Sequence, residues 1–193
     1  MPSLDYNFLN KLQENYKLYT NFIETGTLMG DTIFEMEKFF CNLYTVEIKK
    51  EFYDKVKNKY FGDKINFYLG DSSIVLGKIL PIIKGKSIIF LDGHWSGGNT
   101  GKGVKDCPLY EELKNIILHH KEEAIIIIDD VRLFGKGPIY ANERCNWKNI
   151  NIKNILQIVN SRKTKEYFID SKLYKNDRFI IHVCNMIDLD HGF

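Results

Sequence analysis

The stretch from residue 22 to residue 31 joins an apolar segment to Glu24, two glycines at Gly26 and Gly30, and the start of a helix. Glycine lets the backbone approach a ligand closely, and the free N–H groups of a helix start can bind its anionic end. About twenty residues further on, a second apolar segment ends in Glu47, whose carboxylate can accept both ribose hydroxyls. This spacing predicts a pocket for a nucleotide-like cofactor.

Three further carboxylates follow two later apolar segments, with Asp92 after the first and Asp129 and Asp130 after the second. Carboxylates that converge beside a cofactor repel one another unless a cation neutralises them, and Mg²⁺ or a similar hard ion prefers oxygen ligands. The three acids are therefore candidate metal ligands, although Asp92 could instead cap a turn and the other two could bind backbone amides. His94, two residues beyond Asp92, is the candidate general base.

A glycine-rich loop follows Asp92, from Gly93 to Gly103. It lacks the first glycine and the final Ser or Thr of a phosphate-binding loop, so it is interpreted as a mobile lid or substrate loop. Trp95 in this loop could stack on an adenine ring or anchor the loop.

Strand and helix patterns alternate along the chain. Strands are expected at 21–24, 43–47, 65–69, 87–91 and 124–128, and helices at 31–40, 49–60, 72–83, 108–120 and 150–159. A leading amphipathic helix is expected over about residues 4–19, because Leu9, Leu12, Tyr16 and Tyr19 have helical spacing.

Two last apolar segments, 166–170 and 178–184, are separated by residues 171–177. This gap is too short for the helix that parallel neighbours need, so the two segments should form an antiparallel hairpin. The sequence thus predicts an α/β fold: a Rossmann-like seven-stranded sheet, mostly parallel with an antiparallel C-terminal hairpin, and helices on both faces. One domain over residues 1–193 is expected, with the leading helix as a cap on the site or on a dimer interface.

Bulk properties narrow the function classes. The 193 residues carry a net charge of only +2 and few arginines, which argues against a nucleic-acid partner. The apolar runs are too short for a membrane span, and no signal peptide is apparent at the start. Four scattered cysteines form no C-x-x-C pair, which favours a reducing cytoplasm over a disulfide or zinc framework.

Together these motifs resemble the class I S-adenosylmethionine-dependent methyltransferases, especially the metal-dependent small-molecule and sugar O-methyltransferases of the catechol and macrocin types. The resemblance is carried by the glycine motif 24–30, by Glu47, by the turn 70–72, and by the strand ends 92–95 and 129–131. It implies S-adenosylmethionine contacts from Glu24, Thr25, Gly26, Thr27, Gly30, Asp31, Thr32, Glu47, Gly70, Asp71, Ser72, Asp92 and Trp95. The chain departs from many relatives at Leu28, where they carry a third glycine. It also departs from the catechol type at Ser96, which stands near the position of a lysine.

Each assignment has a plainer alternative. The glycines could merely permit a tight turn, Glu47 could be a solvated strand end, and Asp71 could simply cap the following helix. The expected function is O-methylation of a hydroxyl on a sugar, a glycan or another small molecule, with S-adenosylmethionine and Mg²⁺. A nicotinamide-dependent oxidoreductase, a non-catalytic cofactor-binding module and a nucleic-acid methyltransferase are the alternatives. A homodimer is also possible.

Overall fold

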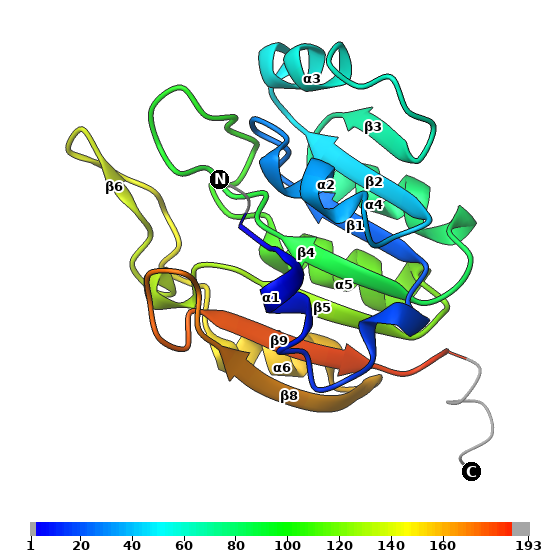
Figure 1. Cartoon of the computed structure of the whole chain (residues 1–193). Helices are drawn as coiled ribbons and strands as arrows, with labels where there is room; N and C mark the ends of the chain where they lie inside the picture. Colours follow the sequence, from blue (N-terminus) through cyan, green and yellow to red (C-terminus); the bar gives the residue numbers. More distant parts are fainter. Residues whose placement is uncertain (1–2, 187–193) are drawn as a thin grey trace.

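The computed structural model describes residues 3–186. Its centre is one seven-stranded sheet in the order β3-β2-β1-β4-β5-β9-β8 (Figure 1). The strands of this sheet are β1 (Asn21–Thr25), β2 (Asn42–Glu47), β3 (Ile65–Leu69), β4 (Ser87–Leu91), β5 (Ala124–Ile128), β8 (Lys163–Ile169) and β9 (Arg178–Val183). The bounds of β3, β4 and β5 agree with the sequence prediction.

The last two strands distinguish this sheet from a fully parallel one. β1 to β5 pair in parallel, whereas β9 lies antiparallel between β5 and β8. The predicted terminal hairpin and the predicted fold class are therefore confirmed. Because β9 runs in the opposite direction, its first residue, Arg178, lies at the same edge of the sheet as the carboxyl end of β5.

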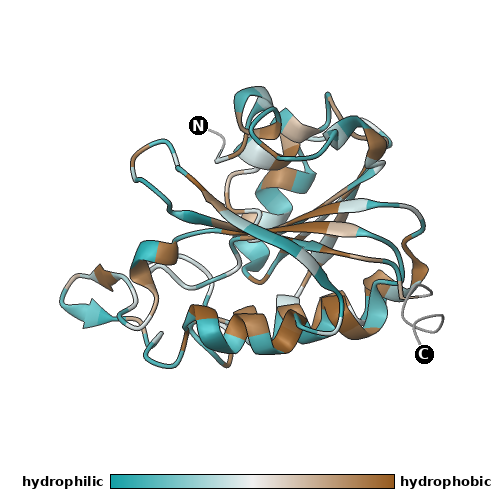
Figure 2. Cartoon of the chain, turned by 90° about the horizontal axis from the view of Figure 1, so that it is seen from below, coloured by the Kyte–Doolittle hydropathy of each residue, from teal (hydrophilic) through white to brown (hydrophobic). Residues whose placement is uncertain are grey.

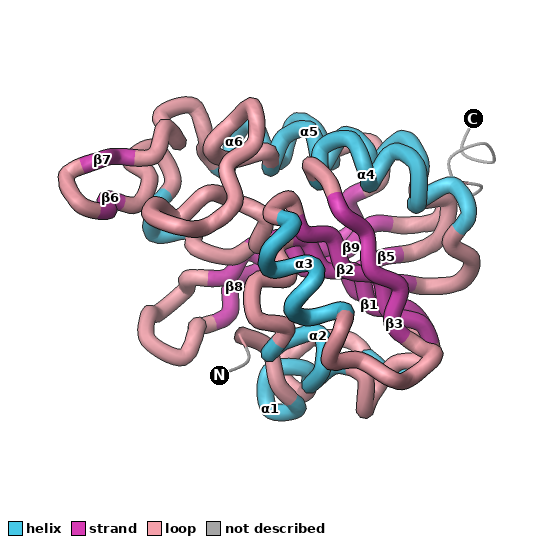
Figure 3. The backbone as a smooth tube through the Cα atoms, turned by 90° about the horizontal axis from the view of Figure 1, so that it is seen from above, coloured by secondary structure: helices cyan, strands magenta, loops and turns pink. Residues whose placement is uncertain are grey.

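Helices cover both faces of the sheet. Figure 3 shows three of them in a row on one face, α4 (Ser72–Ile79), α5 (Leu109–His119) and α6 (Ile152–Val159). The others are α1 (Tyr6–Leu9), α2 (Asp31–Met36) and α3 (Lys50–Lys57), with short 3-10 helices at Tyr16–Leu18, Leu80–Ile82 and Val131–Leu133. Within residues 3–186, no helix has the length and apolar character needed to cross a bilayer.

Alternate residues of each central strand enter one of two apolar layers. Ile89 and Ile126 pack with the α4–α5–α6 face, while Ile88 and Ile125 pack with the opposite face. Figure 2 shows the helices turning apolar residues toward the sheet. Both faces of β4 and β5 are buried, which explains why these strands are continuously apolar and were easy to locate in the sequence.

The leading segment does not form the long helix that the sequence predicted. Only α1 and the 3-10 helix Tyr16–Leu18 form there, although all four residues of the predicted apolar stripe are buried. Side chains compete with the helix for backbone groups: Asn15 accepts from the amide of Lys17, and the amide of Gln13 donates to the Tyr167 hydroxyl at 2.9 Å. Burial of the stripe is thus achieved by an irregular segment lying on β8 and β9.

A second, two-stranded sheet was not predicted. It consists of β6 (Ile139–Tyr140) and β7 (Glu143–Arg144), in a region expected to be a loop. Ala141 and Asn142 connect the strands with positive φ angles of 46° and 67°, as a tight hairpin turn requires. Strands of two residues are too short to show an alternating pattern in the sequence.

A buried histidine at the end of α5 makes stability dependent on pH. His120 is fully buried, neither ring nitrogen has a hydrogen-bond partner, and burial together with Arg162 lowers its pKa to about 4. Below pH 6.5, the ordinary pKa of histidine, His120 is protonated in the unfolded state but stays neutral in the folded state. The free energy of unfolding therefore falls as the pH drops. We expect a loss of about 2 kcal/mol between about pH 7 and pH 5 from this residue.

Urea unfolding of the wild type and of His120→Leu over this pH range checks the expectation. The variant should lose that part of the pH dependence, whereas His119→Leu, at the neighbouring half-buried position, should keep it. Equal pH slopes for the wild type and His120→Leu would contradict the assignment.

Candidate active site

A cleft of about 720 Å³, open to solvent on one side, lies beyond the carboxyl ends of β1, β2, β3 and β4. Glu47, at the end of β2, lines it and is 5 % exposed. One carboxylate oxygen accepts from the amide of Leu28 at 2.8 Å and the other from the amide of Lys49 at 2.9 Å. These bonds fix the carboxylate in place and leave lone pairs that can accept from ligand hydroxyls.

The glycine turn after β1 requires both of its glycines. Gly26 has φ +84°, and a Cβ there would lie 2.3 Å from the backbone oxygen of Asp92. Gly30 has φ +79° and caps α2, where a Cβ would lie 2.6 Å from a methyl carbon of Val56. Gly26 lines the cleft, and its amide donates to Val46 at 2.9 Å, so the turn is held against both neighbouring strands.

Other residues of the glycine motif lie beneath the cleft rather than in its wall. Glu24 is 2 % exposed, and its carboxylate accepts from the Thr45 hydroxyl at 2.8 Å. Burial raises the pKa of Glu24 well above its usual range. Thr27 bonds the same Thr45 hydroxyl at 2.5 Å, and Thr25 is fully buried. These three predicted contact residues therefore support the turn from below.

The first turn of α2 is also set back from the cleft. Thr32 is buried and its hydroxyl accepts from the amide of Ser3 at 2.9 Å, which ties the start of the described chain to α2. Asp31 opens the helix on an exposed surface, and neither residue is part of the cleft lining.

The turn after β3 forms the far rim of the cleft, as predicted. Gly70, Asp71 and Ser72 all line it. Asp71 caps α4 by accepting from the amide of Ser73 at 2.9 Å, so the capping alternative also holds. Its second carboxylate oxygen would lie 2.7 Å from a Cβ at Gly103, so the glycine-rich loop approaches this rim closely.

That loop crosses the mouth of the cleft. A Cβ at Gly101 would lie 2.1 Å from a methyl carbon of Ile48, so the backbone of the loop lies against the side chain next to Glu47. Trp95 is 6 % exposed, its amide donates to Asp106 at 2.7 Å, and Lys102 lies 3.7 Å above its ring. Trp95 is not part of the cleft lining, so in this structure it anchors the loop.

A group of titratable side chains adjoins the cleft at the ends of β4 and β5. His94 Nε2 lies 3.1 Å from Asp130 Oδ2, and Nδ1 lies 3.7 Å from Asp92 Oδ1. Burial and the charge of Asp129 raise the pKa of Asp92 to about 8. Burial alone would lower the pKa of His94, but the neighbouring acids outweigh it and raise that pKa. Asp92 and His94 therefore both favour their protonated forms, and both line the cleft.

Arginines meet the charges of the two acids after β5. Arg178, at the start of β9, donates to both oxygens of Asp129 at 3.1 and 3.3 Å. Arg132 bonds both Asp130 and Asp177, and together with His94 it outweighs burial and lowers the pKa of Asp130. Asp129 and Asp130 therefore lie together, as predicted, but guanidinium groups are their partners.

This arrangement fits a metal ion poorly. The acids whose oxygens approach within 4.8 Å of one another are Asp129, Asp130 and Asp177, and the predicted ligand Asp92 is not among them. Arg132 and Arg178 already occupy carboxylate oxygens of all three. A divalent ion would have to displace these donors, so no reaction step is derived through it.

Sequence reasoning missed Arg178 and Asp177 because they are distant in the chain from the side chains that they contact, whereas Arg132 lies only two residues beyond Asp130. Arg178 lies 49 residues beyond Asp129, and Asp177 lies 45 residues beyond Arg132. The usable signal was the predicted hairpin: an antiparallel β9 beside β5 brings the start of β9 to the end of β5.

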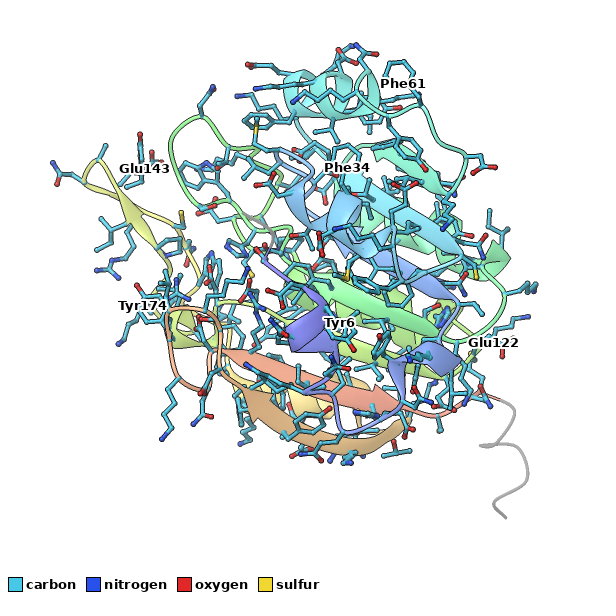
Figure 4. The ribbon with its side chains drawn as sticks, viewed as in Figure 1. Tyr6, Phe34, Phe61, Glu122, Glu143 and Tyr174 are labelled. Atoms are coloured by element: carbon cyan, nitrogen blue, oxygen red, sulfur yellow. The ribbon has the colours of Figure 1, made fainter. Side chains whose placement is uncertain are left out.

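Two projecting segments flank the side of the site away from Glu47. Figure 4 shows Tyr174, on the loop between β8 and β9, and Glu143, on the β6–β7 hairpin, beyond the same end of the sheet. Tyr174 stacks on the Arg132 guanidinium at 4.1 Å, and Tyr140 packs against the backbone of Gly97 and Gly98.

Comparisons with known proteins identify the fold. The chain matches no family model and no curated protein. Among solved structures, it is similar to a protein from Listeria monocytogenes inferred to be an S-adenosylmethionine-dependent methyltransferase, with 10 % identity, coverage of 94 % of this chain and 97 % of that chain, and a TM-score of 0.57.

Two further similar structures differ in acceptor. One is the N-methyltransferase NodS from Bradyrhizobium japonicum in complex with S-adenosyl-L-homocysteine, with 8 % identity, coverage of 87 % and 79 %, and a TM-score of 0.52. The other is an rRNA methylase from Streptococcus thermophilus, with 9 % identity, coverage of 87 % of both chains, and a TM-score of 0.52. The fold is thus the Rossmann-like fold of these methyltransferases, and it does not specify the acceptor.

The cleft has features that a nucleotide-like ligand requires. Glu47 presents a fixed, buried carboxylate at the tip of β2. The Gly26 turn and the loop glycines leave space that side chains would fill.

Proposed function

We propose that the protein is an S-adenosylmethionine-dependent O-methyltransferase that acts on a hydroxyl of a sugar, a glycan or another small molecule. The observation that supports this most is the junction of two features: a cleft with Glu47 fixed at its centre, and the Asp92–His94 pair in the wall of that cleft. The cleft with Glu47 suits the cofactor, and the Asp92–His94 pair suits proton removal.

The bound cofactor supplies a methyl group on a positively charged sulfur. The residues of the chain have three tasks. Glu47 accepts the ribose hydroxyls, and the glycine turn at Gly26 admits the rest of the ligand to the backbone. The Asp92–His94 pair takes the proton of the acceptor hydroxyl, while Asp130 holds the imidazole through Nε2. Positioning of donor and acceptor contributes a large part of the rate, as in other displacement reactions.

A hydroxyl acceptor suits this site better than an amine. A neutral amine attacks without prior loss of a proton, whereas a hydroxyl becomes a good nucleophile only as its proton leaves. The paired imidazole and carboxylate beside the cleft provide for that step. The oxidoreductase alternative is not favoured, because the structural neighbours include methyltransferases, one of them in complex with S-adenosyl-L-homocysteine.

Calorimetric titration with S-adenosylmethionine, S-adenosylhomocysteine and NAD⁺ tests the cofactor. We expect micromolar binding of the first two and none of NAD⁺. Transfer of a labelled methyl group to a panel of sugars, glycans, phenols, amines and RNA then tests the acceptor. Tight binding of NAD⁺ alone, or labelling of amines or RNA in preference to hydroxyl compounds, would overturn the proposal.

Replacement of Glu47 should weaken the cofactor selectively. Glu47→Ala is expected to reduce the affinity for S-adenosylmethionine about thirtyfold, because a hydrogen bond to a charged group contributes about 1.5–3 kcal/mol. Glu51→Ala, on the exposed face of α3, removes the same charge nearby and should change affinity less than twofold. Equal affinities of the two variants would contradict the ribose assignment.

Removal of divalent metal should leave the reaction intact. The sequence predicted Mg²⁺ because three converging acids need neutralisation, and Arg178, Arg132 and His94 provide it. Dialysis against EDTA is therefore expected to change the transfer rate less than twofold. A rate that falls on chelation and returns with added Mg²⁺ would reinstate the metal.

A further inference from the structure

A small inner chamber lies behind the cofactor cleft, on the α5 side of Gly93 and His94. It shares these two residues with the cleft. Apolar and aromatic side chains form most of its wall, including Leu91, Leu109 and Trp147. The exception from α5 is a carboxylate, Glu112, which the function described above does not use.

Glu112 is buried without full compensation of its charge. It is 2 % exposed, and its Oε1 atom has no hydrogen-bond partner. The hydroxyls of Ser72 and Thr25 and the nearby charge of His94 favour the charged form, but no group reaches hydrogen-bonding geometry with Oε1. Burial, with a smaller contribution from Asp71, raises the pKa of Glu112 to about 7. An uncompensated carboxylate in this setting destabilises the folded chain.

The destabilising burial of Glu112 can serve a function because this residue lies close to the cleft. A Cβ added at Gly93 would lie 2.9 Å from Glu112 Oε1 and 2.9 Å from the Thr25 hydroxyl. Gly93 also lines the cleft, so only the backbone of a glycine separates the carboxylate from the cofactor space. A larger residue at this position would push the carboxylate away.

We propose that Glu112 is a buried counter-charge that favours the positively charged sulfonium form of the cofactor over its neutral thioether product. The inference rests on the proposed function, since it requires that S-adenosylmethionine occupies the cleft. Methyl transfer removes one positive charge from the sulfur, while the ammonium and carboxylate of the amino-acid part remain. An unpaired negative charge at short range therefore distinguishes substrate from product by charge alone.

The test compares two ligands across three variants by calorimetry. In Glu112→Gln, the dissociation constant of S-adenosylmethionine should rise about tenfold, and that of S-adenosylhomocysteine should change less than twofold. Glu112→Asp keeps the charge and should keep most of the preference. Glu111→Gln removes a charge from the adjacent residue, which pairs with Lys105 at 2.6 Å, and should leave both constants within twofold.

Thermal unfolding of the ligand-free variants provides a second readout. A structural role for Glu112 predicts that Glu112→Gln unfolds at a lower temperature, whereas the counter-charge predicts a higher one, because an uncompensated buried charge is removed. Equal weakening of both ligands, or unchanged affinity for both, would overturn the inference while leaving the proposed function standing. If the wild type bound neither ligand, the proposed function would fail and the inference with it.

Discussion

Replacement of His94 by Gln is expected to lower the turnover number by a factor of about 10² to 10⁴, the range found for removal of a general acid–base group. The imidazole lies between Asp92 and Asp130, and a Gln side chain cannot take up and release a proton in its place. The amide of Gln can still donate to Asp130, so the wall of the cleft should keep its shape. Affinity for S-adenosylmethionine should change less than threefold.

The rate is measured with the acceptor identified by the labelling panel, and affinity by calorimetry. Asp130→Asn serves as the companion variant: it removes the negative charge that faces Nε2 but keeps the imidazole, so the expected loss is smaller, about ten- to a hundredfold. Addition of free imidazole should restore part of the activity of His94→Gln. A turnover number within tenfold of the wild type would remove His94 from the chemistry.

The sequence was informative where a residue pattern allowed only one structural interpretation. Continuous apolar runs flanked by polar turns located β4 and β5 because both faces of these strands are buried. Glu47 could be placed because strand ends of a parallel sheet meet at one edge, and its distance from the glycine turn corresponds to one helix and one strand. The short gap before β9 identified the hairpin for a similar geometric reason.

The same patterns failed where partners come from distant parts of the chain. Nothing near Asp129 in the sequence indicates that Arg178 neutralises it, so a metal ion was the natural expectation. Trp95 could be interpreted as a stacking or an anchoring residue, and only its burial beneath Lys102 distinguishes the two. The apolar residues of the leading segment have helical spacing. This spacing indicates which residues are buried, but it does not indicate the local hydrogen bonds that interrupt the helix.

Glu112 shows a signal that was present but unused. Leu109, Leu113 and Ile116 define the inward face of α5, and Glu112 follows Leu109 by three residues, so it falls on the same face. A carboxylate at such a position is either paired, protonated or kept for a ligand. A search for charged residues on predicted inward faces would have selected it.

Replacement of Arg162 by Ala is expected to have the largest effect on stability, a loss of about 4 kcal/mol, because a buried charged donor leaves several acceptors unpaired. Arg162 is 2 % exposed, and its guanidinium donates to five carbonyls: Ile116, Ile117, His120, Glu122 and Cys184. These belong to the end of α5, the connection to β5 and the segment after β9. The Arg162 side chain therefore links these three segments at one corner of the sheet and holds α5, the helix that carries Glu112, in place.

Urea unfolding measures this loss, and two further variants interpret it. Arg162→Lys keeps one cationic donor and should recover about half of the lost free energy, since an ammonium cannot reach acceptors on three segments at once. Arg144→Ala, on the exposed β6–β7 hairpin, should change the free energy of unfolding by less than about 0.5 kcal/mol. If Arg162→Ala were no less stable than Arg144→Ala, the carbonyls at the end of α5 would find other donors, and the position of Glu112 would not depend on this corner of the sheet.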